Sequence, residues 1–96
     1  MLVFNVTFHC GHGMRERFLE KIVEEGIVAG ARAEAGNCRY DFYRSVDRDC
    51  DLLLIEQYRD ADALAEHIRQ AHTAKLVALK EAYVTDMRIE RYETSD

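Results

Sequence analysis

The feature that most constrains the fold is a short apolar run, Leu52-Leu53-Leu54-Ile55, which continues as Glu56-Gln57-Tyr58. Its residue types predict a β-strand, and successive side chains of a strand point to opposite faces of the sheet. Both faces of this strand are apolar where it begins, so both must be covered. In a chain of 96 residues, one helix layer covers one face and nothing else can cover the other. The sequence therefore predicts a homodimer that buries the sheet face opposite the helices.

Hydrophobic periodicity places this strand third among four and adds two helical segments. In chain order, the predicted elements are a strand at 2–9, a helix at 14–33, a strand at 38–46, the strand at 52–58, a helical segment at 60–83 and a strand at 87–92. The order β-α-β-β-α-β is the ferredoxin-like, split-βαβ arrangement, in which both helices cover one face of an antiparallel sheet. We therefore expect a single α+β domain over residues 1–96.

The helix predicted at 14–33 is amphipathic. Its apolar stripe, at helical spacing, consists of Phe18, Leu19, Ile22, Val23, Gly26, Ala29 and Ala33. Ile27 and Val28 lie off this stripe, which indicates that the far end of the helix is also covered. Gly36-Asn37 marks the place where the segment stops.

Charge and composition exclude several classes of partner. The 13 basic and 18 acidic residues give a net charge of −5, and phosphate contacts need a basic face, so we expect no nucleic-acid partner. No apolar run approaches the roughly 18 residues of a membrane helix, and residues 1–6 lack the pattern of a signal peptide. We expect a cytoplasmic protein without membrane contact. Cys10, Cys38 and Cys50 show no CxxC spacing, which predicts reduced cysteines and no disulfide or zinc framework.

The run His9-Cys10-Gly11-His12 contains residue types that bind metals. His9 and Cys10 are neighbours in a strand, so they point to opposite faces and cannot easily hold one ion. The sequence indicates no base beside Cys10, so we expect an inert, buried thiol. We predict no metal site and no cofactor.

A histidine interrupts the apolar stripe of the second helical segment. Taken as one helix, the stripe consists of Ala61, Leu64, Ala65, Ile68, His72, Leu76, Leu79 and Tyr83. His72 lies at its centre, whereas His67 lies to the side. His72 is either a core histidine bonded to a backbone carbonyl or a base or donor in a pocket between helix and sheet. The spacing favours His72 over His67 as the residue that faces the sheet.

Glu56 and Tyr58 continue the strand face that carries Leu52 and Leu54. This placement has two interpretations, a solvated strand end or a carboxylate set into a pocket. If this face lies beneath the helices, Glu56 and Tyr58 converge with the helical histidine, and Asn5 or Thr7 arrives from the first strand. Such an apolar cavity with a few polar groups is the usual form of a small-molecule site. The predicted catalytic residues are His72, Glu56 and His67, and the predicted substrate contacts are Asn5, Tyr58, Leu54 and Leu64.

Several short segments form a set that is specific in its order and spacing. They are Glu34-Ala35-Gly36-Asn37 with Tyr40, Leu54-Ile55-Glu56-Gln57-Tyr58, Asp62-Ala63-Leu64-Ala65-Glu66-His67 and Gln70-Ala71-His72. This set resembles the antibiotic biosynthesis monooxygenase family, small dimeric α/β barrels that include quinol monooxygenases. The resemblance extends over almost the whole chain, so it implies the fold more firmly than the substrate.

The chain departs from the family pattern at three positions. His12 and Ala71 stand where the family has prolines, and Tyr58 stands where many members have tryptophan. The Pro-His step of the family implies a helix break near residues 69–71. If the helix breaks there, the helical spacing does not continue from His67 to His72, and His67 points inward in place of His72.

The resemblance implies oxygenation of an electron-rich phenol or quinol without metal, flavin or haem. Such chemistry needs a dry pocket, a base that takes the phenolic proton and donors that hold the anion. Two alternatives remain open, an isomerase of a small oxygenated metabolite and a non-catalytic small-molecule-binding stress-response module. Haem degradation is disfavoured, because relatives with that activity rely on a tryptophan and this chain has none.

Overall fold

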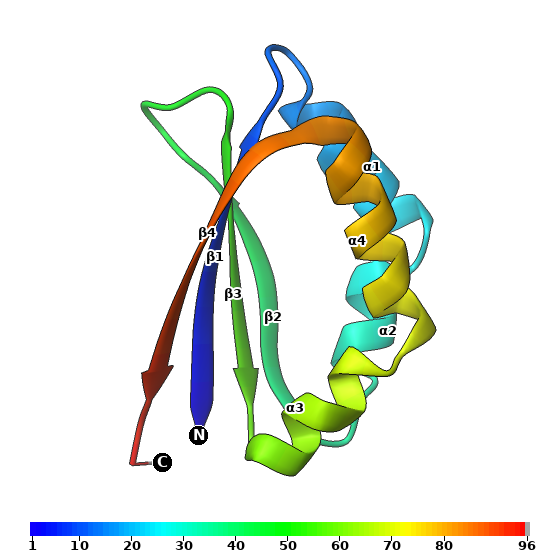
Figure 1. Cartoon of the computed structure of the whole chain (residues 1–96), viewed down its shortest axis with the longest axis vertical. Coiled ribbons are helices and arrows are strands. Elements are labelled where there is room, and N and C mark those ends of the chain that lie inside the picture. Colours follow the sequence, from blue (N-terminus) through cyan, green and yellow to red (C-terminus); the bar gives the residue numbers. More distant parts are fainter. Residues whose placement is uncertain (96) are drawn as a thin grey trace.

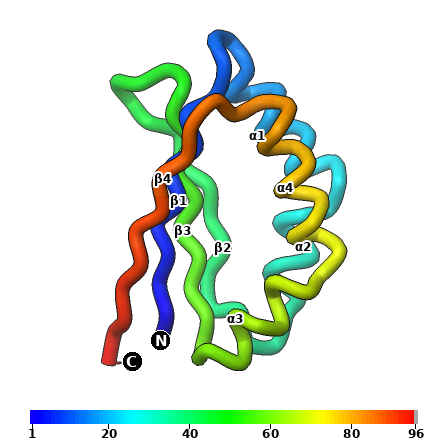
Figure 2. The backbone as a smooth tube through the Cα atoms, in the orientation of Figure 1, coloured from blue at the N-terminus to red at the C-terminus, as the bar shows by residue number. Residues whose placement is uncertain are grey.

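The computed structural model describes residues 1–95 and confirms the predicted fold class, with each helical segment divided in two (Figure 1). Its elements, in chain order, are β1 (Leu2–Cys10), α1 (Arg15–Glu24), α2 (Ile27–Arg32), β2 (Asn37–Arg44), β3 (Asp51–Tyr58), α3 (Ala61–Ile68), α4 (Ala71–Tyr83) and β4 (Val84–Glu93). The strands form one antiparallel sheet in the order β2-β3-β1-β4, and all the helices lie on one side of it, as Figure 2 also shows. The sheet is open, since β2 and β4 are its two edges.

The strand register determines which side chains face the helices. β1 pairs with β3 so that Phe4 lies opposite Glu56 and Asn5 lies opposite Ile55. Because side chains alternate along a strand, Phe4 and Glu56 face the helices, whereas Asn5 and Ile55 face the other side. The core lies on the helix side and consists of Val6, Phe8, Cys10, Phe18, Ile22, Ile27, Ala31, Tyr40, Leu52 and Leu54.

The first helical segment is interrupted at Gly26, so the prediction of one continuous helix at 14–33 is wrong. Gly26 has a φ of 73°, a left-handed conformation that glycine adopts without steric cost. The break rotates the chain, so Ile27, which lay off the predicted stripe, is fully buried. Val23, a member of that stripe, is 61% exposed. The stripe therefore holds for Phe18 and Ile22 and fails at its C-terminal end.

The second helical segment is also interrupted, between α3 and α4. Asp60 caps α3, because its side chain accepts a hydrogen bond from the Ala63 amide at 2.9 Å, as its residue type predicts. Gln70 then adopts an extended conformation, with a ψ of 147°, before α4 begins. The break lies where the Pro-His step of the family implies one, and the stripe drawn through residues 60–83 as one helix does not continue across it.

The sheet face opposite the helices carries apolar side chains at its centre. Val3, Leu53 and Ile55 lie there and are only half-buried in the single chain. Among the described residues, the helices cover only the other face (Figure 1). The homodimer expected from this face stays a prediction. No helix within residues 1–95 has the length and apolar character needed to cross a membrane.

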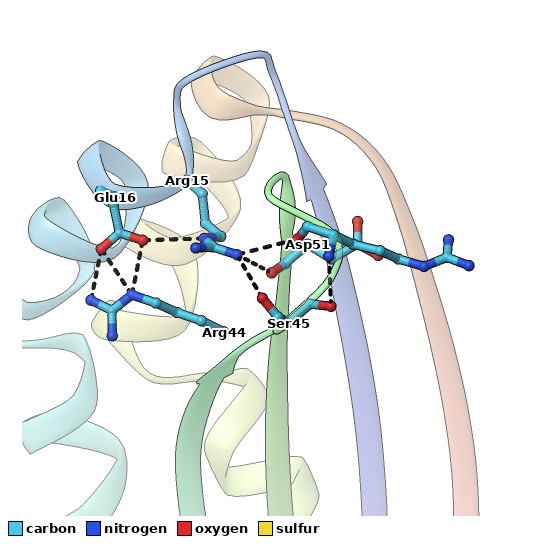
Figure 3. Close-up of polar contacts among 6 residues, drawn as sticks. Arg15, Glu16, Arg44, Ser45 and Asp51 are labelled. Atoms are coloured by element: carbon cyan, nitrogen blue, oxygen red, sulfur yellow. Dashed lines mark hydrogen bonds and ion pairs between the residues drawn. The ribbon is translucent and has the colours of Figure 1, made fainter.

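Arg15 secures the loop between β2 and β3, at the end of the sheet remote from α3 (Figure 3). Its Nη1 group donates to the backbone carbonyl oxygens of Ser45, Arg48 and Asp51, at 3.3, 3.2 and 3.3 Å. One guanidinium thus donates to three carbonyl groups at the end of the hairpin, two of which, those of Arg48 and Asp51, also accept a backbone N–H. We call these four residues the arginine clamp.

Beside the arginine clamp, Glu16 and Arg44 form a bidentate ion pair (Figure 3). Glu16 accepts from Arg44 Nη2 at 2.7 Å and from its Nε at 2.8 Å. The hydrogen bonds from Arg44 lower the pKa of Glu16 to about 2, and Arg15 contributes in the same direction. Both side chains of the pair are more than half exposed. This end of the sheet therefore holds its charges in contact with solvent.

Candidate functional site

A cavity of about 270 Å³ lies between the sheet and the helices α3 and α4. Its polar lining residues are Glu56, His67, Thr73 and Lys80. The remaining wall is apolar and consists of Phe4, Val6, Phe8, Leu54, Leu64, Ile68, Leu76, Val77, Met87 and Ile89. The structure thus places Leu54, Leu64, Glu56 and His67, four of the predicted site residues, in one wall. An apolar cavity with a few convergent polar groups is the usual form of a small-molecule site.

A larger hollow, of about 560 Å³, lies on the opposite sheet face and has a different character. Charged side chains of both signs line it, from Arg44, Arg48, Asp51, Asp86 and Arg88. This is the face that the sequence predicts to meet a second copy of the chain. We therefore take the smaller, apolar cavity as the candidate functional site.

Glu56 and Tyr58 form a buried pair at one end of the cavity. Both project from the helix-facing side of β3, and the Tyr58 hydroxyl donates to Glu56 Oε1 at 2.5 Å. Burial raises the pKa of Glu56, and the hydrogen bond from Tyr58 opposes that shift. Burial also raises the pKa of Tyr58, and the nearby Glu56 carboxylate adds to the effect. Tyr58 is fully buried behind Glu56, so of the two it is Glu56 that reaches the cavity wall.

His67 stands between this pair and a second carboxylate. It is 6% exposed, and its Nε2 atom lies 3.6 Å from Glu56 Oε1 and 3.4 Å from Thr73 Oγ1. Its Nδ1 atom lies 2.8 Å from Glu34 Oε2. The imidazole ring also packs on Tyr58, with ring centroids 4.9 Å apart. One ring edge of His67 thus faces the cavity, and the other faces a carboxylate behind it.

Glu34 is a residue of the site that the sequence did not identify, as are Thr73 and Lys80 of the cavity wall. It lies in the turn between α2 and β2, and its side chain is 10% exposed. The turn packs directly against α3, because a Cβ atom at Gly36 would lie only 2.3 Å from Ala63 Cβ. Periodicity cannot point to a residue between two elements. The one signal was that Glu34 belongs to a segment through which the chain resembles its family.

His72 does not lie in the cavity wall, so the prediction that it faces the sheet in preference to His67 is wrong. Its Nε2 atom lies 2.5 Å from Glu34 Oε2, on the far side of that carboxylate from His67. The opposite edge of its ring packs on α2, where a Cβ atom at Gly30 would lie 2.5 Å from His72 Nδ1. The physical reason is the break at Gln70, which ends the helical phase on which the prediction depended.

Asn5 is also placed differently from the prediction. It is paired with Ile55 and therefore lies on the sheet face opposite Glu56, as does Thr7, which is paired with Leu53. Neither residue lines the cavity. The expected convergence of Asn5 or Thr7 with Glu56 is wrong, because an odd-numbered residue of β1 cannot share a face with Phe4.

Glu34, His67 and His72 are the described residues best placed to hold a metal ion, since their ligand atoms all lie within 4.8 Å of one another. Zinc forms bonds of about 2.0–2.2 Å to nitrogen and oxygen, which requires an open centre among the ligands. Here Glu34 Oε2 lies at hydrogen-bond distance from both ring nitrogens, 2.8 Å from His67 Nδ1 and 2.5 Å from His72 Nε2. The geometry is that of two imidazoles that share one carboxylate oxygen.

Cys10 is buried, as predicted, and His9 is exposed on the other side of β1. Burial raises the pKa of the Cys10 thiol to about 11, and the nearby Cys50 thiol adds to the shift. Because the thiolate is the nucleophilic form, a thiol with this pKa is poorly reactive at neutral pH.

Comparisons with known proteins agree on one family. The family model "Antibiotic biosynthesis monooxygenase" matches residues 1–79. YcnE of Bacillus subtilis (strain 168), which is named only provisionally as a monooxygenase, is 31% identical over 97 residues, with 100% of both chains covered. The crystal structure of PA3566 from Pseudomonas aeruginosa superposes with a TM-score of 0.86 at 26% identity, covering 99% of this chain and 94% of the other. Rv0793 from Mycobacterium tuberculosis gives 0.86 at 25% identity, covering 99% and 95%.

Proposed function

This chain belongs to the antibiotic biosynthesis monooxygenase family, and we propose that it catalyses the cofactor-free oxygenation of a small phenol or quinol in the apolar cavity. The observation that carries the proposal is the distribution of polar groups in the cavity wall. His67 Nε2, Glu56 Oε1 and Thr73 Oγ1 lie together at one end, and apolar side chains form most of the rest. An aromatic ring with a hydroxyl group at one edge has the complementary distribution.

The proposed reaction starts with proton transfer from the substrate hydroxyl to His67 Nε2. The resulting phenolate carries electron density on its ring carbons and reduces dioxygen directly. One oxygen atom is inserted at a ring C–H, and the other leaves as water with the two hydrogens that the substrate loses. A phenol thus becomes a quinone, and the substrate supplies all four electrons.

The cavity wall supports these steps in two ways. The apolar side chains exclude water, which strengthens the contacts between the phenolate and the polar groups around it. Glu56 offers a carboxylate oxygen to a second hydroxyl of a quinol, while Tyr58 holds that carboxylate in place from behind. In this role Tyr58 orients Glu56 and does not itself touch the substrate.

Oxygen uptake with 1-naphthol as the probe tests the proposal. We expect protein-dependent oxygen consumption, formation of 1,4-naphthoquinone, and one labelled oxygen in the product when the reaction is run under ¹⁸O₂. The control is the His67→Ala variant, which keeps the cavity but lacks the base. Binding of naphthols without any oxygen uptake would contradict the proposal in favour of a binding module, and product formation without oxygen would indicate an isomerase.

We further propose that the chain forms a homodimer through the sheet face opposite the helices. Its support is the apolar centre of that face, where Val3, Leu53 and Ile55 remain half-exposed in the single chain. A contiguous apolar face left in water favours association. Sedimentation at micromolar concentration should show a species of twice the chain mass of 11.1 kDa, and Leu53→Lys should shift it to the monomer. Wild-type protein that sediments only as a monomer would overturn the assembly without affecting the cavity.

A further inference from the structure

We infer that Glu34 is a positioning residue that fixes the tautomer of His67, so that the nitrogen facing the cavity carries a free lone pair. The inference rests on the proposed function, because a base is needed only if a substrate proton is removed in the cavity. It concerns a residue that does not touch the cavity itself. Its contacts to His67 and His72 carry the argument.

A neutral imidazole has one N–H group and one bare nitrogen, and its hydrogen bonds decide which nitrogen is which. At Nδ1, His67 meets Glu34 Oε2 at 2.8 Å, and a carboxylate oxygen can only accept. At Nε2, the distances are longer, 3.4 Å to Thr73 Oγ1 and 3.6 Å to Glu56 Oε1. The proton therefore belongs on Nδ1, and the lone pair on Nε2 faces the cavity.

The polar groups near Nε2 are weaker acceptors for a ring proton because they lie farther away. Glu56 Oε1 already accepts the hydroxyl of Tyr58 at 2.5 Å and lies 3.6 Å from Nε2. Thr73 Oγ1 donates to the backbone carbonyl of His67 at 2.6 Å and lies 3.4 Å from Nε2. Glu34, at 2.8 Å from Nδ1, is therefore the preferred acceptor for the N–H of His67. Nε2 is thus the one ring position left for a substrate.

His72 completes the arrangement by holding Glu34. Its Nε2 atom lies 2.5 Å from the same Oε2 atom, so two imidazole N–H groups donate to one carboxylate oxygen. Two donors compensate for the burial of that oxygen, whereas Glu34 Oε1 has no partner among the described residues. His72 itself has no part in the cavity wall. Its expected role is to orient Glu34, two steps from the substrate.

The tautomers can be observed directly in protein labelled with ¹⁵N-histidine, since long-range ¹H–¹⁵N spectra distinguish a protonated from a bare ring nitrogen. We expect wild-type His67 to be protonated on Nδ1 and bare on Nε2. In Glu34→Leu, which removes the acceptor, His67 should change to the Nε2–H form. Glu66→Leu is the matched control, because Glu66 precedes His67 on α3, is exposed and does not contact the ring. It should leave the tautomer of His67 unchanged.

Gly30→Ala tests the role of His72 without altering any side chain that forms a hydrogen bond. The new methyl group would lie 2.5 Å from His72 Nδ1, so the His72 ring must shift. We expect the ring signals of His72 to shift while His67 keeps its Nδ1–H tautomer. An unchanged His72 would contradict the placement described here.

The activity readout separates this inference from the proposed function. With 1-naphthol, Glu34→Leu should lower kcat by about 10- to 100-fold with little change in KM, part of the 10²–10⁴ that a general base contributes. If wild-type His67 carries its proton on Nε2, the inference is wrong whatever the activity. If the tautomer changes as expected but no variant consumes oxygen, the proposed function fails and the positioning role stands.

A metal site in the same cluster is the rival explanation. Titration of the wild-type protein with Zn²⁺ decides between the two. We expect no stoichiometric binding that depends on this cluster. Binding of one Zn²⁺ that Glu34→Leu and His72→Ala abolish and Glu66→Leu retains would overturn the inference. The wild-type spectra need no variant to fold, so the tautomer of His67 is tested even if Glu34→Leu unfolds.

Discussion

The two ends of the sheet shift the pKa of a glutamate in opposite directions. At the end beside α3, Glu56 is buried against Tyr58 and His67, and burial raises its pKa. At the other end, Glu16 lies exposed between two arginines, and hydrogen bonds from Arg44 lower its pKa to about 2 (Figure 3). The first arrangement weakens the charged form of a carboxylate, and the second stabilises it.

This difference indicates at which end of the sheet residues are expected to affect a reaction and at which end they are expected to affect only stability. Ion pairs in solvent contribute little to folding, because water screens them. Buried titratable groups cost folding free energy unless they are paired, so their presence indicates a role at a site. We therefore expect variants at the α3 end to change turnover, and variants at the loop end to change only the stability of the hairpin.

The largest expected effect is on turnover. His67→Ala should lower the rate of oxygen uptake with 1-naphthol by about 100-fold or more, because a general base typically contributes 10²–10⁴. Arg44→Ala, at the exposed end, should keep the wild-type rate. His72→Ala should fall between them, because it acts only through Glu34. A rate loss for Arg44→Ala as large as that for His67→Ala would break the distinction between the two ends.

The next effect concerns the free energy of unfolding. Tyr58→Phe removes the donor to buried Glu56 and should destabilise the fold by about 1–3 kcal/mol, the usual penalty for an unsatisfied buried polar group. The same pairing recurs on β4, where the Tyr92 hydroxyl donates to Glu90 Oε2 at 3.1 Å in solvent. Tyr92→Phe, on the sheet face opposite the helices, is the matched control and should shift the urea midpoint less than Tyr58→Phe. Equal midpoint shifts in both variants would show that burial does not set the difference.

A smaller loss is expected from the arginine clamp. Arg15→Met keeps the apolar stem of the side chain but removes its hydrogen bonds to the carbonyls of Ser45, Arg48 and Asp51. These groups are partly solvated and can bond water instead, so the free energy of unfolding should fall by only about 1 kcal/mol. Hydrogen exchange in the β2–β3 loop should quicken, while the rate of oxygen uptake stays unchanged.

The smallest effect, and the sharpest comparison, is the dependence of stability on pH. The pKa of Glu56 is raised on folding above 4.5, so as pH rises from 4.5 the unfolded state loses this proton first and stability falls. The pKa of Glu16 is lowered on folding from 4.5 to about 2, so its contribution is present above 4.5 and is lost as pH falls toward 2. Glu56→Gln should therefore flatten the loss above pH 4.5, and Glu16→Gln the loss below it. Urea midpoints from pH 2.5 to 8 measure both.

The fold could be predicted from the sequence because it depends on residue types that repeat at fixed spacing. The apolar run at 52–55 and the alternation in residues 2–9 correctly fix which residues belong to the strands. The helix breaks could not be read in the same way. Gly26 interrupts its helix by a backbone conformation, and no proline marks the interruption at Gln70.

The candidate site shows the same limit more clearly. Leu54, Glu56 and Leu64 were placed correctly, because each lies within one uninterrupted element. The cavity wall contains His67 and not His72, the reverse of the prediction, because the relative orientation of the two residues depends on a break between them. Glu34 went unnoticed, because only the packing of Gly36 on Ala63 brings its turn to the site. The direction in which side chains point can be followed along one uninterrupted helix or strand, but contacts between elements depend on the whole fold.

One feature of α4 bears on how a ligand reaches the cavity. This helix spans 13 residues and none of them is fully buried, although Leu76 and Val77 help to form the cavity wall. Leu76, Leu79 and Tyr83 pack against the core but stay partly exposed, so α4 should undergo local unfolding more readily than the sheet, whose strands hold fully buried residues. We expect the cavity to open by displacement of α4 about its junction at Gln70, while the strands stay in register. A bound ligand would then stabilise the closed position of α4 and slow its displacement.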